Sequence, residues 1–526
     1  MALAIILASE PGLYDLSSWV NLMNTEFLDY MIVFLYTIFI GGLMNVNIYF
    51  AEEIRECDRL AEDSGLSIFS LMENSGHALF EGMSKLLDKK QRIGILAGGG
   101  NNGGDGIVLS RLLLNHGYKA ELIFPLGLPS SRVAQDHLDY YKTCGYRYST
   151  EIEGGYDVLI DGLFGIGFRP PFTKQMIECL DFWKKSHALK IAIDIPSGVE
   201  ANHGRVEAAF QADHTFCLHG AKPSAFLYPS GTYYGELHIL DIGLPQRARF
   251  RVWTEEDVRG TWPAAKDYTH KGTFGTGLLI AGSRQMPGCA ILAGTGAMRA
   301  GVGKLVMATE KTVADSCVIS LPEATYVDRE DSQWRKDPSI SKIAAVAIGP
   351  GLKPDDSLEN LITDFLEESE YPVILDAGAL SERSYPKGRK SPVILTPHPG
   401  EMARITGKTV AEVNENRIQL ASDYAISHHV TVVLKGMNTV IAFPDGTGFV
   451  NVTGNRGLSK GGTGDTLTGI LLGMASQGYQ PSTAANAVYL HGKTAELYAE
   501  EKAPSSMLAS DIMQIWPVLL RKLELI

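Results

Sequence analysis

Short apolar runs alternate with amphipathic stretches along most of the chain, from Ile48 onward. Strands that are apolar on both faces are typical of a parallel sheet covered by helices on each side. The pattern therefore predicts an α/β fold. In the first half it predicts helices at 51–63, 66–87 and 106–117, and strands at 92–100, 120–127, 156–167 and 189–198.

The same alternation restarts after the segment QRARFRVWTEEDV at 246–258. We interpret that segment as a junction between two three-layer αβα domains, one at 44–247 and one at 248–526. Apolar runs of the second half lie at 275–283, 304–309, 342–351, 371–378, 391–401, 430–436 and 438–446, and helices are expected at 465–478 and 483–500.

Residues 27–44 form the most apolar stretch of the chain. Its apolar core is shorter than the roughly 20 residues of a spanning helix, and no Lys or Arg precedes Arg55. A membrane anchor is therefore the less favoured interpretation. We expect residues 1–43 to be an extension outside the globular part, or the product of a misplaced start codon.

Composition narrows the classes of function. The net charge of −13 argues against a nucleic-acid binder with a basic surface. Six cysteines without a CxxC pair predict neither a disulfide framework nor a zinc site, and they suit a reducing cytoplasm. Glycine is unusually frequent, at 55 of 526 residues, which indicates tight turns that approach a ligand.

The first half carries a glycine-rich loop, GGGNNGGDG at 98–106, between a predicted strand and a predicted helix. Backbone amides at such a turn bind anions, although a plain surface turn has similar composition. Asp161 and Asp194 follow two further strands. Because parallel strands end at one edge of the sheet, Asn102, Asp161 and Ser197 could converge as a hard-cation site. A lone aspartate at a strand end is more often a helix cap.

NNGGDG, followed by DGLFGIG and DIPSG, resembles the NAD(P)H-hydrate epimerase family over about residues 47–245. The resemblance implies a Rossmann-like domain with one K⁺ held by Asn102, Asp161 and Ser197. It implies interconversion of the R and S hydrates at C6 of the reduced nicotinamide ring, with Asp194 as the candidate acid–base group. The implied hydrate-binding residues are Asn101, Asn102, Gly103, Gly104, Asp105, Gly165, Ile166, Gly167, Phe168, Arg169, Pro170, Pro171 and Asp194.

The second half carries KGGTGDTLTG at 460–469, a glycine loop that opens a helix. The amides of Gly462 to Gly464 would stabilise a phosphoryl group in transfer, and Asp465 could accept the proton of a hydroxyl group. Aspartate is also a common helix cap, so Asp465 alone would be weak evidence. The whole string resembles the ribokinase-like fold.

Four further strings resemble the ADP-dependent NAD(P)H-hydrate dehydratase over about 250–523: HKGTFGTGLLIAGS, IGPGL, TPHPGE and LKGMNTVI. One departure is Asn455–Ser459, where many relatives read NPGMA; it affects the expected nucleotide contacts rather than the phosphoryl chemistry. The resemblance implies Mg²⁺ and Asp465 as the catalytic group. It implies an ADP site of Lys435, Gly436, Met437, Asn438, Thr439 and Gly464, and a hydrate site of Ala290, Gly351, His398 and Asp465.

The two resemblances together imply repair of hydrated NAD(P)H. ADP would phosphorylate the C6 hydroxyl, and phosphate would then leave with help from the ring nitrogen. The partners expected are NAD(P)H hydrates and ADP, in a cytoplasmic homo-oligomer without nucleic acid or membrane. Two alternatives stay open: a small-molecule kinase of the vitamin type, which shares the GTGD loop, and a non-enzymatic binding module in the first half.

Overall fold

The computed structural model describes residues 46–264 and 268–525, so the segment 1–43 lies outside the described residues. The first half contains a seven-stranded parallel sheet in the order β4-β3-β2-β5-β6-β7-β8. Its strands are β2 (Arg92–Ala97), β3 (Lys119–Ile123), β4 (Tyr148–Ser149), β5 (Val158–Gly162), β6 (Leu189–Ile193), β7 (His214–Leu218) and β8 (Glu236–Leu240).

The helices α4 and α5 lie where the periodicity predicts helices, α7 and α8 were not predicted, and α6 starts earlier than predicted. The predicted helix begins at residue 106, whereas α6 begins at Asn101, so the NNGGD segment is its first turn. Glycine makes this close start feasible: a Cβ atom at Gly103 would lie 2.0 Å from the carbonyl oxygen of Gly98. The helices are α4 (Ala51–Asp63), α5 (Ile68–Met83), α6 (Asn101–Asn115), α7 (Arg132–Thr143) and α8 (Lys174–Lys185), with short 3₁₀ turns η1 (Pro223–Phe226) and η2 (Ser230–Tyr233).

The second half is built on an eleven-stranded sheet in the order β1-β9-β18-β17-β16-β15-β14-β13-β10-β11-β12. The run from β16 to β12 is parallel, and β17 is antiparallel to both of its neighbours. Its strands are β9 (Phe250–Val252), β10 (Thr276–Ile280), β11 (Lys304–Thr309), β12 (Thr325–Asp328), β13 (Ala345–Ile348), β14 (Val373–Leu375), β15 (Val393–Leu395), β16 (Thr431–Leu434), β17 (Thr439–Ala442) and β18 (Gly448–Asn451).

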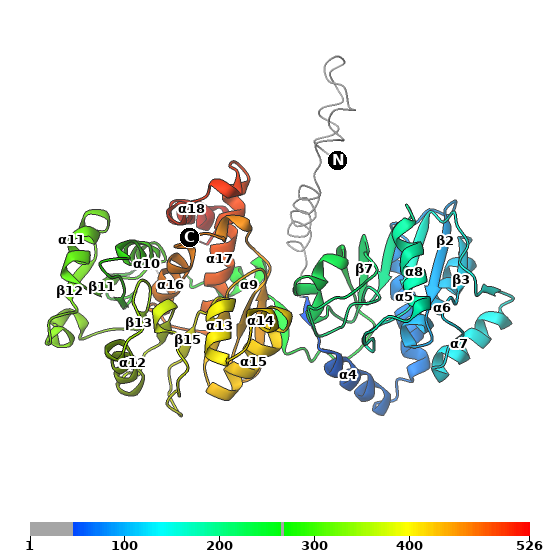
Figure 1. Ribbon diagram of the computed structural model, residues 1–526, viewed down its shortest axis with the longest axis horizontal. Coiled ribbons are helices and arrows are strands. Elements are labelled where there is room, and N and C mark those ends of the chain that lie inside the picture. Colours follow the sequence, from blue (N-terminus) through cyan, green and yellow to red (C-terminus); the bar gives the residue numbers. More distant parts are fainter. Residues whose placement is uncertain (1–45, 265–267, 526) are drawn as a thin grey trace, which may run out of the picture.

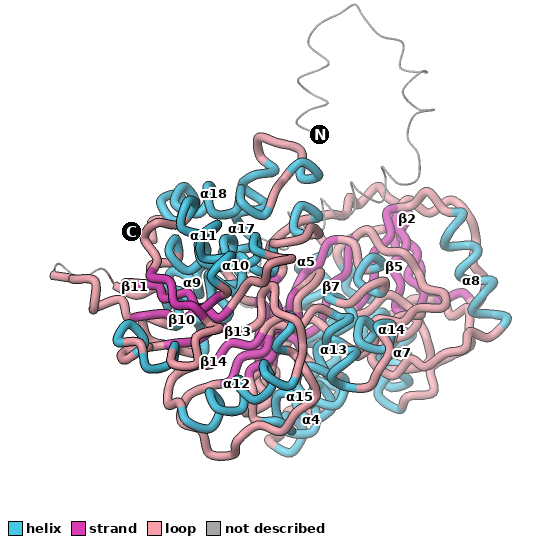
Figure 2. The backbone as a smooth tube through the Cα atoms, turned by 60° about the vertical axis from the view of Figure 1, so that its left-hand side comes forward, coloured by secondary structure: helices cyan, strands magenta, loops and turns pink. Residues whose placement is uncertain are grey.

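Helices again cover both faces, and strands lie between helices in each half (Figure 2). Glycines let α10 and α16 cross closely, because a Cβ atom at Gly469 would lie 1.9 Å from the carbonyl oxygen of Ala293. The fold class expected from the sequence, two αβα domains, is confirmed. The helices are α9 (Glu255–Thr261), α10 (Pro287–Arg299), α11 (Lys311–Ser320), α12 (Asp356–Glu368), α13 (Pro399–Thr406), α14 (Val410–Glu415), α15 (Arg417–His428), α16 (Thr463–Ala475), α17 (Pro481–Ala499) and α18 (Ala509–Lys522).

The two halves lie side by side and share one strand pairing (Figure 1). The short strand β1 (Asn47–Ile48) comes from the first half but pairs antiparallel with β9 in the second sheet. Side chains of both halves also form one continuous apolar cluster, which includes Ile48, Phe226 and Phe250. Between residues 46 and 525, leaving out 265–267, no helix combines the length and the apolar character needed to cross a bilayer.

Candidate active sites

A cavity of about 190 Å³ opens at the carboxyl edge of the first sheet. Its walls come from α4, α5, the start of α6 and the loops that follow β5, β6 and β7. Six of the predicted hydrate-binding residues line it: Asn101, Asn102, Asp105, Gly165, Ile166 and Asp194. The sequence reasoning missed four polar residues in the same walls, namely Asp58, Ser75, His219 and Lys222.

Asp194 directly follows β6, and its carboxylate is held from two sides. Its backbone φ is +67°, a conformation fixed by the bond from its amide to the carbonyl oxygen of Phe216. The Leu218 amide donates to its Oδ1 at 3.0 Å, and the buried ammonium of Lys222 forms an ion pair with the same oxygen. Lys222 also donates to two backbone carbonyl oxygens. The carboxylate is therefore rigidly positioned at the cavity wall.

Two further carboxyl groups face this ion pair. Burial and the nearby Asp194 charge raise the pKa of Asp58 to about 6. Burial, together with the charges of Asp194 and Asp58, raises the pKa of Asp105 well above its ordinary value. A protonated carboxyl group and an ionised one can thus face the same small cavity, which is the arrangement that general acid–base chemistry needs.

Asn102, Asp161 and Ser197, predicted as a cation site, are brought together. The Ser197 hydroxyl and amide both donate to the Asp161 carboxylate, at 2.6 and 2.7 Å. The Asn102 amide group donates to the carbonyl oxygens of Phe164 and Ile193. Burial raises the pKa of Asp161 to about 6, and no basic side chain in the described part of the chain pairs with it.

The remaining predicted residues of the first half lie elsewhere. Gly103 and Gly104 are buried in the first turn of α6, where a Cβ atom would meet Gly98 or Met72. Gly167 is exposed, and the Arg169 guanidinium lies 4.0 Å from Glu200. A separate hollow of about 350 Å³ is lined by three of the others: Phe168, Pro170 and Pro171.

A cavity of about 360 Å³ lies beside the glycine loop of the second half. The divergent segment contributes Asn455, Arg456, Leu458 and Ser459 to its walls, so the departure from the family string falls at this site. His491, which the sequence reasoning missed, also lines it. All six predicted ADP-binding residues line the cavity: Lys435, Gly436, Met437, Asn438, Thr439 and Gly464.

Asp465 occupies the third position of α16, directly after the glycine loop. Burial and the nearby Asp376 charge raise its pKa to about 6, although a hydrogen bond with the Cys289 thiol and the Lys435 charge oppose the shift. The carboxylate is thus ionised at neutral pH, and its raised pKa makes it a stronger base than an exposed aspartate.

Lys435 lies between the cavity and the buried end of β14. Its ammonium forms an ion pair with Asp376 at 2.7 Å, and Thr468 donates to the other oxygen of Asp376. Burial alone would lower the pKa of Lys435, but the charges of Asp376 and Glu401 raise it overall. A Cβ atom at Gly464 would lie 3.3 Å from the Lys435 nitrogen, so the ammonium reaches the glycine loop.

Three of the predicted hydrate residues of the second half, Ala290, Gly351 and Asp465, lie next to Cys289. Gly351 has a φ of +70°, and a Cβ atom there would lie 3.0 Å from that of Cys289. Ala290 is fully buried beneath Gly282. His398 caps α13 with Nδ1, which accepts from the Gly400 amide at 3.0 Å, and most of its ring stays exposed. Its partner in the cap is the buried Glu401, which the sequence reasoning missed.

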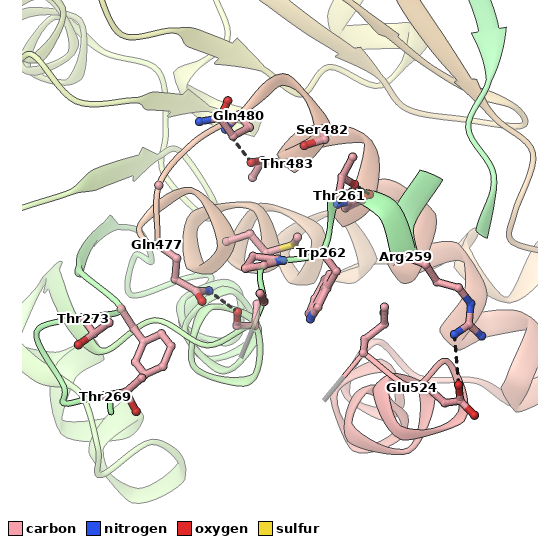
Figure 3. A pocket seen from close by; sticks show the side chains of 18 residues that line it. Arg259, Thr261, Trp262, Thr269, Thr273, Gln477, Gln480, Ser482, Thr483 and Glu524 are labelled. Atoms are coloured by element: carbon pink, nitrogen blue, oxygen red, sulfur yellow. Dashed lines mark hydrogen bonds and ion pairs between the residues drawn. The ribbon is translucent and has the colours of Figure 1, made fainter. Parts of the chain in front are cut away.

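A third hollow, of about 610 Å³, is drawn with its lining side chains in Figure 3. Met474, near the carboxyl end of α16, lines it, whereas Asp465 lies in the first turn of that helix. Trp262, Gln477 and Thr483 line it, and the Arg259 guanidinium lies 3.7 Å from Glu524 at its rim. None of the predicted site residues contributes to this hollow.

The fold defines an α/β enzyme with a candidate active site at the carboxyl edge of each of its two sheets. Residues 69–224 match the family model of the YjeF-related protein N-terminus, and residues 277–518 match that of NAD(P)H-hydrate dehydratase. The chain therefore belongs to the family of bifunctional NAD(P)H-hydrate repair enzymes, with an epimerase half and a dehydratase half.

Individual relatives agree with this assignment. The bifunctional NAD(P)H-hydrate repair enzyme Nnr of Moorella thermoacetica is 33% identical and covers 90% of this chain and 96% of its own. The ADP-dependent (S)-NAD(P)H-hydrate dehydratase of Bacillus subtilis is 49% identical over 52% of this chain and 98% of its own. A crystal structure of the B. subtilis ADP/ATP-dependent dehydratase covers the same shares with 48% identity and a TM-score of 0.49.

Proposed function

We propose that the second half dehydrates the S hydrate through Asp465 and uses ADP bound in the 360 Å³ cavity. The observation that carries the proposal is that Asp465, whose pKa is raised to about 6, directly follows Gly464 in a cavity wall to which every predicted ADP residue contributes. Asp465 takes the proton of the C6 hydroxyl as that oxygen attacks the terminal phosphorus of ADP, and AMP leaves. The C6–O bond of the new phosphate ester then breaks with the ring-nitrogen lone pair assisting, phosphate leaves, and loss of a proton from C5 to solvent forms the C5=C6 double bond of NAD(P)H.

Lys435 and the glycine loop provide the positive charge and the hydrogen-bond donors that face the phosphates. The ammonium, held by Asp376, and the amides of Gly462 to Gly464 stabilise the negative charge of the phosphoryl group in transfer. Cys289 orients the Asp465 carboxylate through its hydrogen bond. The preorganised arrangement costs no reorganisation when the phosphoryl group moves.

The residues near this site also fit Mg²⁺. Mg²⁺ takes one or two protein carboxylates and fills its other positions with phosphate oxygens and water. Glu401 is a buried carboxylate close enough to raise the pKa of both Lys435 and Asp465, and it would hold the ion. When bound, Mg²⁺ neutralises charge on the nucleotide phosphates.

In the first half, we propose that Asp194 is the proton-transfer group for epimerisation of the hydrate. Lys222 and the Leu218 amide fix its position, and the cavity places it opposite Asp105, whose raised pKa keeps a proton available. The amides at the start of α6 would bind the phosphates of the hydrated nucleotide.

Asn102, Asp161 and Ser197 fit K⁺ in chemistry. Asp161 is a buried carboxylate with no basic partner in the described residues, Ser197 contacts it directly, and Asn102 bonds the carbonyl oxygens of Phe164 and Ile193 nearby. Oxygen ligands of this kind suit a hard monovalent cation. When bound, K⁺ supplies the positive charge that Asp161 lacks.

The assignment of the second half is tested by supplying S hydrate with ADP or ATP and following recovery of reduced-cofactor absorbance. We expect recovery with ADP, loss of at least about a hundredfold in Asp465→Asn, and a normal rate in Asp511→Asn. Asp511 is the matched control because it occupies the same third position of α18 and caps that helix. Phosphorylation of an unrelated alcohol without cofactor recovery would favour the kinase alternative instead.

The assignment of the first half is tested with R hydrate in the presence of excess dehydratase. We expect Asp194→Asn to slow conversion toward the uncatalysed rate and Asp157→Asn to leave it unchanged. Asp157 accepts a backbone hydrogen bond from Arg92 at the opposite edge of the sheet. An unchanged rate in Asp194→Asn would remove that residue from the mechanism without affecting the dehydratase assignment.

We also propose that the chain forms a homo-oligomer in the cytoplasm. A homo-oligomer and a cytoplasmic location follow from the resemblance and from the unpaired cysteines, of which Cys144 is exposed. Light scattering on the purified chain would measure the first.

A further inference from the structure

Three side chains at the amino-terminal ends of β7 and β8 place their polar atoms unusually close together. His214 begins β7, and Glu236 and His238 lie on the neighbouring edge strand β8, all on one face of the sheet. His214 Nδ1 lies 3.1 Å from His238 Nε2 and 3.3 Å from Glu236 Oε2, and His238 Nε2 lies 3.7 Å from Glu236 Oε1. The epimerase cavity lies at the other edge of this sheet.

We propose that His214, Glu236 and His238 form a binding site for a divalent transition-metal ion, with Zn²⁺ as the expected occupant. In a tetrahedral zinc site with metal–ligand bonds of about 2.0–2.1 Å, neighbouring ligand atoms lie about 3.3 Å apart. The separation of the two ring nitrogens, 3.1 Å, and that of His214 Nδ1 from Glu236 Oε2, 3.3 Å, are close to that value, and the other carboxylate oxygen lies 3.7 Å from His238 Nε2. Two imidazoles and one carboxylate are a zinc ligand set, and the partial exposure of all three side chains leaves the fourth position to water.

A shared ion explains the cluster better than hydrogen bonding among the three groups does. A proton on one ring can join His214 to His238, but the carboxylate then stays farther away than the roughly 2.7–2.9 Å of a charge-assisted hydrogen bond. The ring of His238 is also fixed in orientation, because it stacks on Phe216 with ring centroids 4.3 Å apart and planes 11° apart.

A metal here would act on the fold rather than on the chemistry of the hydrate. The strand β8 ends the seven-stranded sheet, so an ion bound by both strands ties the edge strand to β7. The cysteine pattern could not indicate this site, because the proposed ligands are histidines and a glutamate. Glu236 and His238 come close to His214 only through the pairing of β7 with β8.

The test is Zn²⁺ titration of the full chain by calorimetry after chelator treatment, in a buffer with excess Mg²⁺. Cys144 is replaced by serine throughout, because its exposed thiol is a competing ligand. We expect one equivalent of Zn²⁺ to bind, and binding weaker by at least about tenfold in Glu236→Gln and in His238→Ala. His77→Ala is the matched control, since His77 is an exposed histidine that pairs with one glutamate only.

A second measurement reports on the same ion. Zn²⁺ should raise the melting temperature of the parent chain and of His77→Ala, and should not raise that of Glu236→Gln. The epimerase rate without zinc checks that each variant is folded. If His238→Ala does not fold, the zinc affinity of Glu236→Gln alone tests the proposed site. Failure of the parent chain to bind one equivalent, or unchanged affinity in Glu236→Gln, would overturn the proposal.

Discussion

Asp465 shows how one residue can set the pH dependence of the dehydratase. Its pKa is raised to about 6, first by burial and then by Asp376. The ionised form accepts the hydroxyl proton, so we expect kcat/KM for the S hydrate to be constant above about pH 7. Below about pH 6 it should fall about tenfold per pH unit. Initial rates between pH 5 and 8 check this expectation.

The raised pKa of Asp465 also predicts how the stability of the folded chain depends on pH, which tests it independently of the activity. The folded state holds the Asp465 proton more tightly than the unfolded state, so the parent chain loses stability as the pH rises from about 4 to about 6. Asp465→Asn removes that ionisation, and this variant should melt above the parent chain at pH 7.5. An acid limb that persists in the residual activity of Asp465→Asn would assign the limb to another group.

Lys222 is the residue whose loss should affect the first site most. It is 1% exposed and pairs with Asp194, so Lys222→Met leaves a carboxylate buried without its cation. Breaking such a pair costs about 3–5 kcal/mol. We expect a lower melting temperature and loss of epimerisation, with dehydration of the S hydrate retained. Lys142→Met, in an exposed pair with Asp139, should change neither activity nor melting temperature.

Residues differ in how far the sequence could predict them. Asp465, Lys435 and Gly464 belong to contiguous strings. Lys435 and Gly464 line one cavity, and Asp465 follows Gly464 and interacts with the Lys435 charge. Asp58 and Cys289 have no such signal, because Asp58 lies in an ordinary amphipathic helix and Cys289 in the first turn of another. Only the packing of α4 and α10 against distant loops reveals that they face the sites.

At the scale of elements, the start of α6 depends on one close approach. A Cβ atom at Gly103 would lie 2.0 Å from the Gly98 carbonyl oxygen. Because that oxygen belongs to the backbone and cannot rotate away as a side chain can, the helix itself would have to shift. We expect Gly103→Ala to destabilise the first half by about 1–3 kcal/mol and to abolish epimerisation. Thermal unfolding and the R-hydrate assay measure the two effects.

Gly100→Ala is the matched comparison for that helix. Gly100 precedes α6 with a negative φ, and a Cβ atom there would have nothing within 4 Å. This variant should fold normally and lose less than about 1 kcal/mol. Equal behaviour of the two variants would mean that the glycines are needed for ligand contact rather than for packing.

Strands and helices differ in how well their limits followed from the pattern. The buried strands were predictable because runs such as VLI and VVL are apolar on both faces. The helix ends at the glycine loops were not predictable, because glycine and asparagine are typical of turns. Only tertiary packing makes the NNGGD segment helical. For the same reason, the two-residue strand β1 carried no signal of its own.

The whole molecule adds a relation between the halves that neither half shows alone. The predicted boundary at 247–248 stays a prediction, but the strand β1 crosses it by pairing with β9. Further bonds join the halves: the Gly204 amide donates to the Glu415 carbonyl oxygen, and the Asn438 side chain donates to the Phe226 carbonyl oxygen at 3.0 Å. Because Asn438 lines the ADP cavity, this last bond connects the epimerase half to the nucleotide site.

We therefore expect Asn438→Gly in the full chain to raise the KM for ADP by about two- to tenfold, the worth of one hydrogen bond. The epimerase rate should not change. Glycine is the suitable replacement because Asn438 has a φ of +55°, which alanine would tolerate poorly. His203→Ala, which removes a contact with Asn416 elsewhere between the halves, should leave the KM for ADP unchanged.

A direct contact of Asn438 with ADP would raise the KM as well, and a shortened chain separates the two causes. Residues 248–526 keep Asn438 but lack Phe226, so the bond between the halves is already absent there. If that bond orders the 436–439 loop, the shortened chain should show the raised KM, and Asn438→Gly should add nothing to it. A further increase from Asn438→Gly in the shortened chain would place the effect in the nucleotide contact and leave the halves uncoupled.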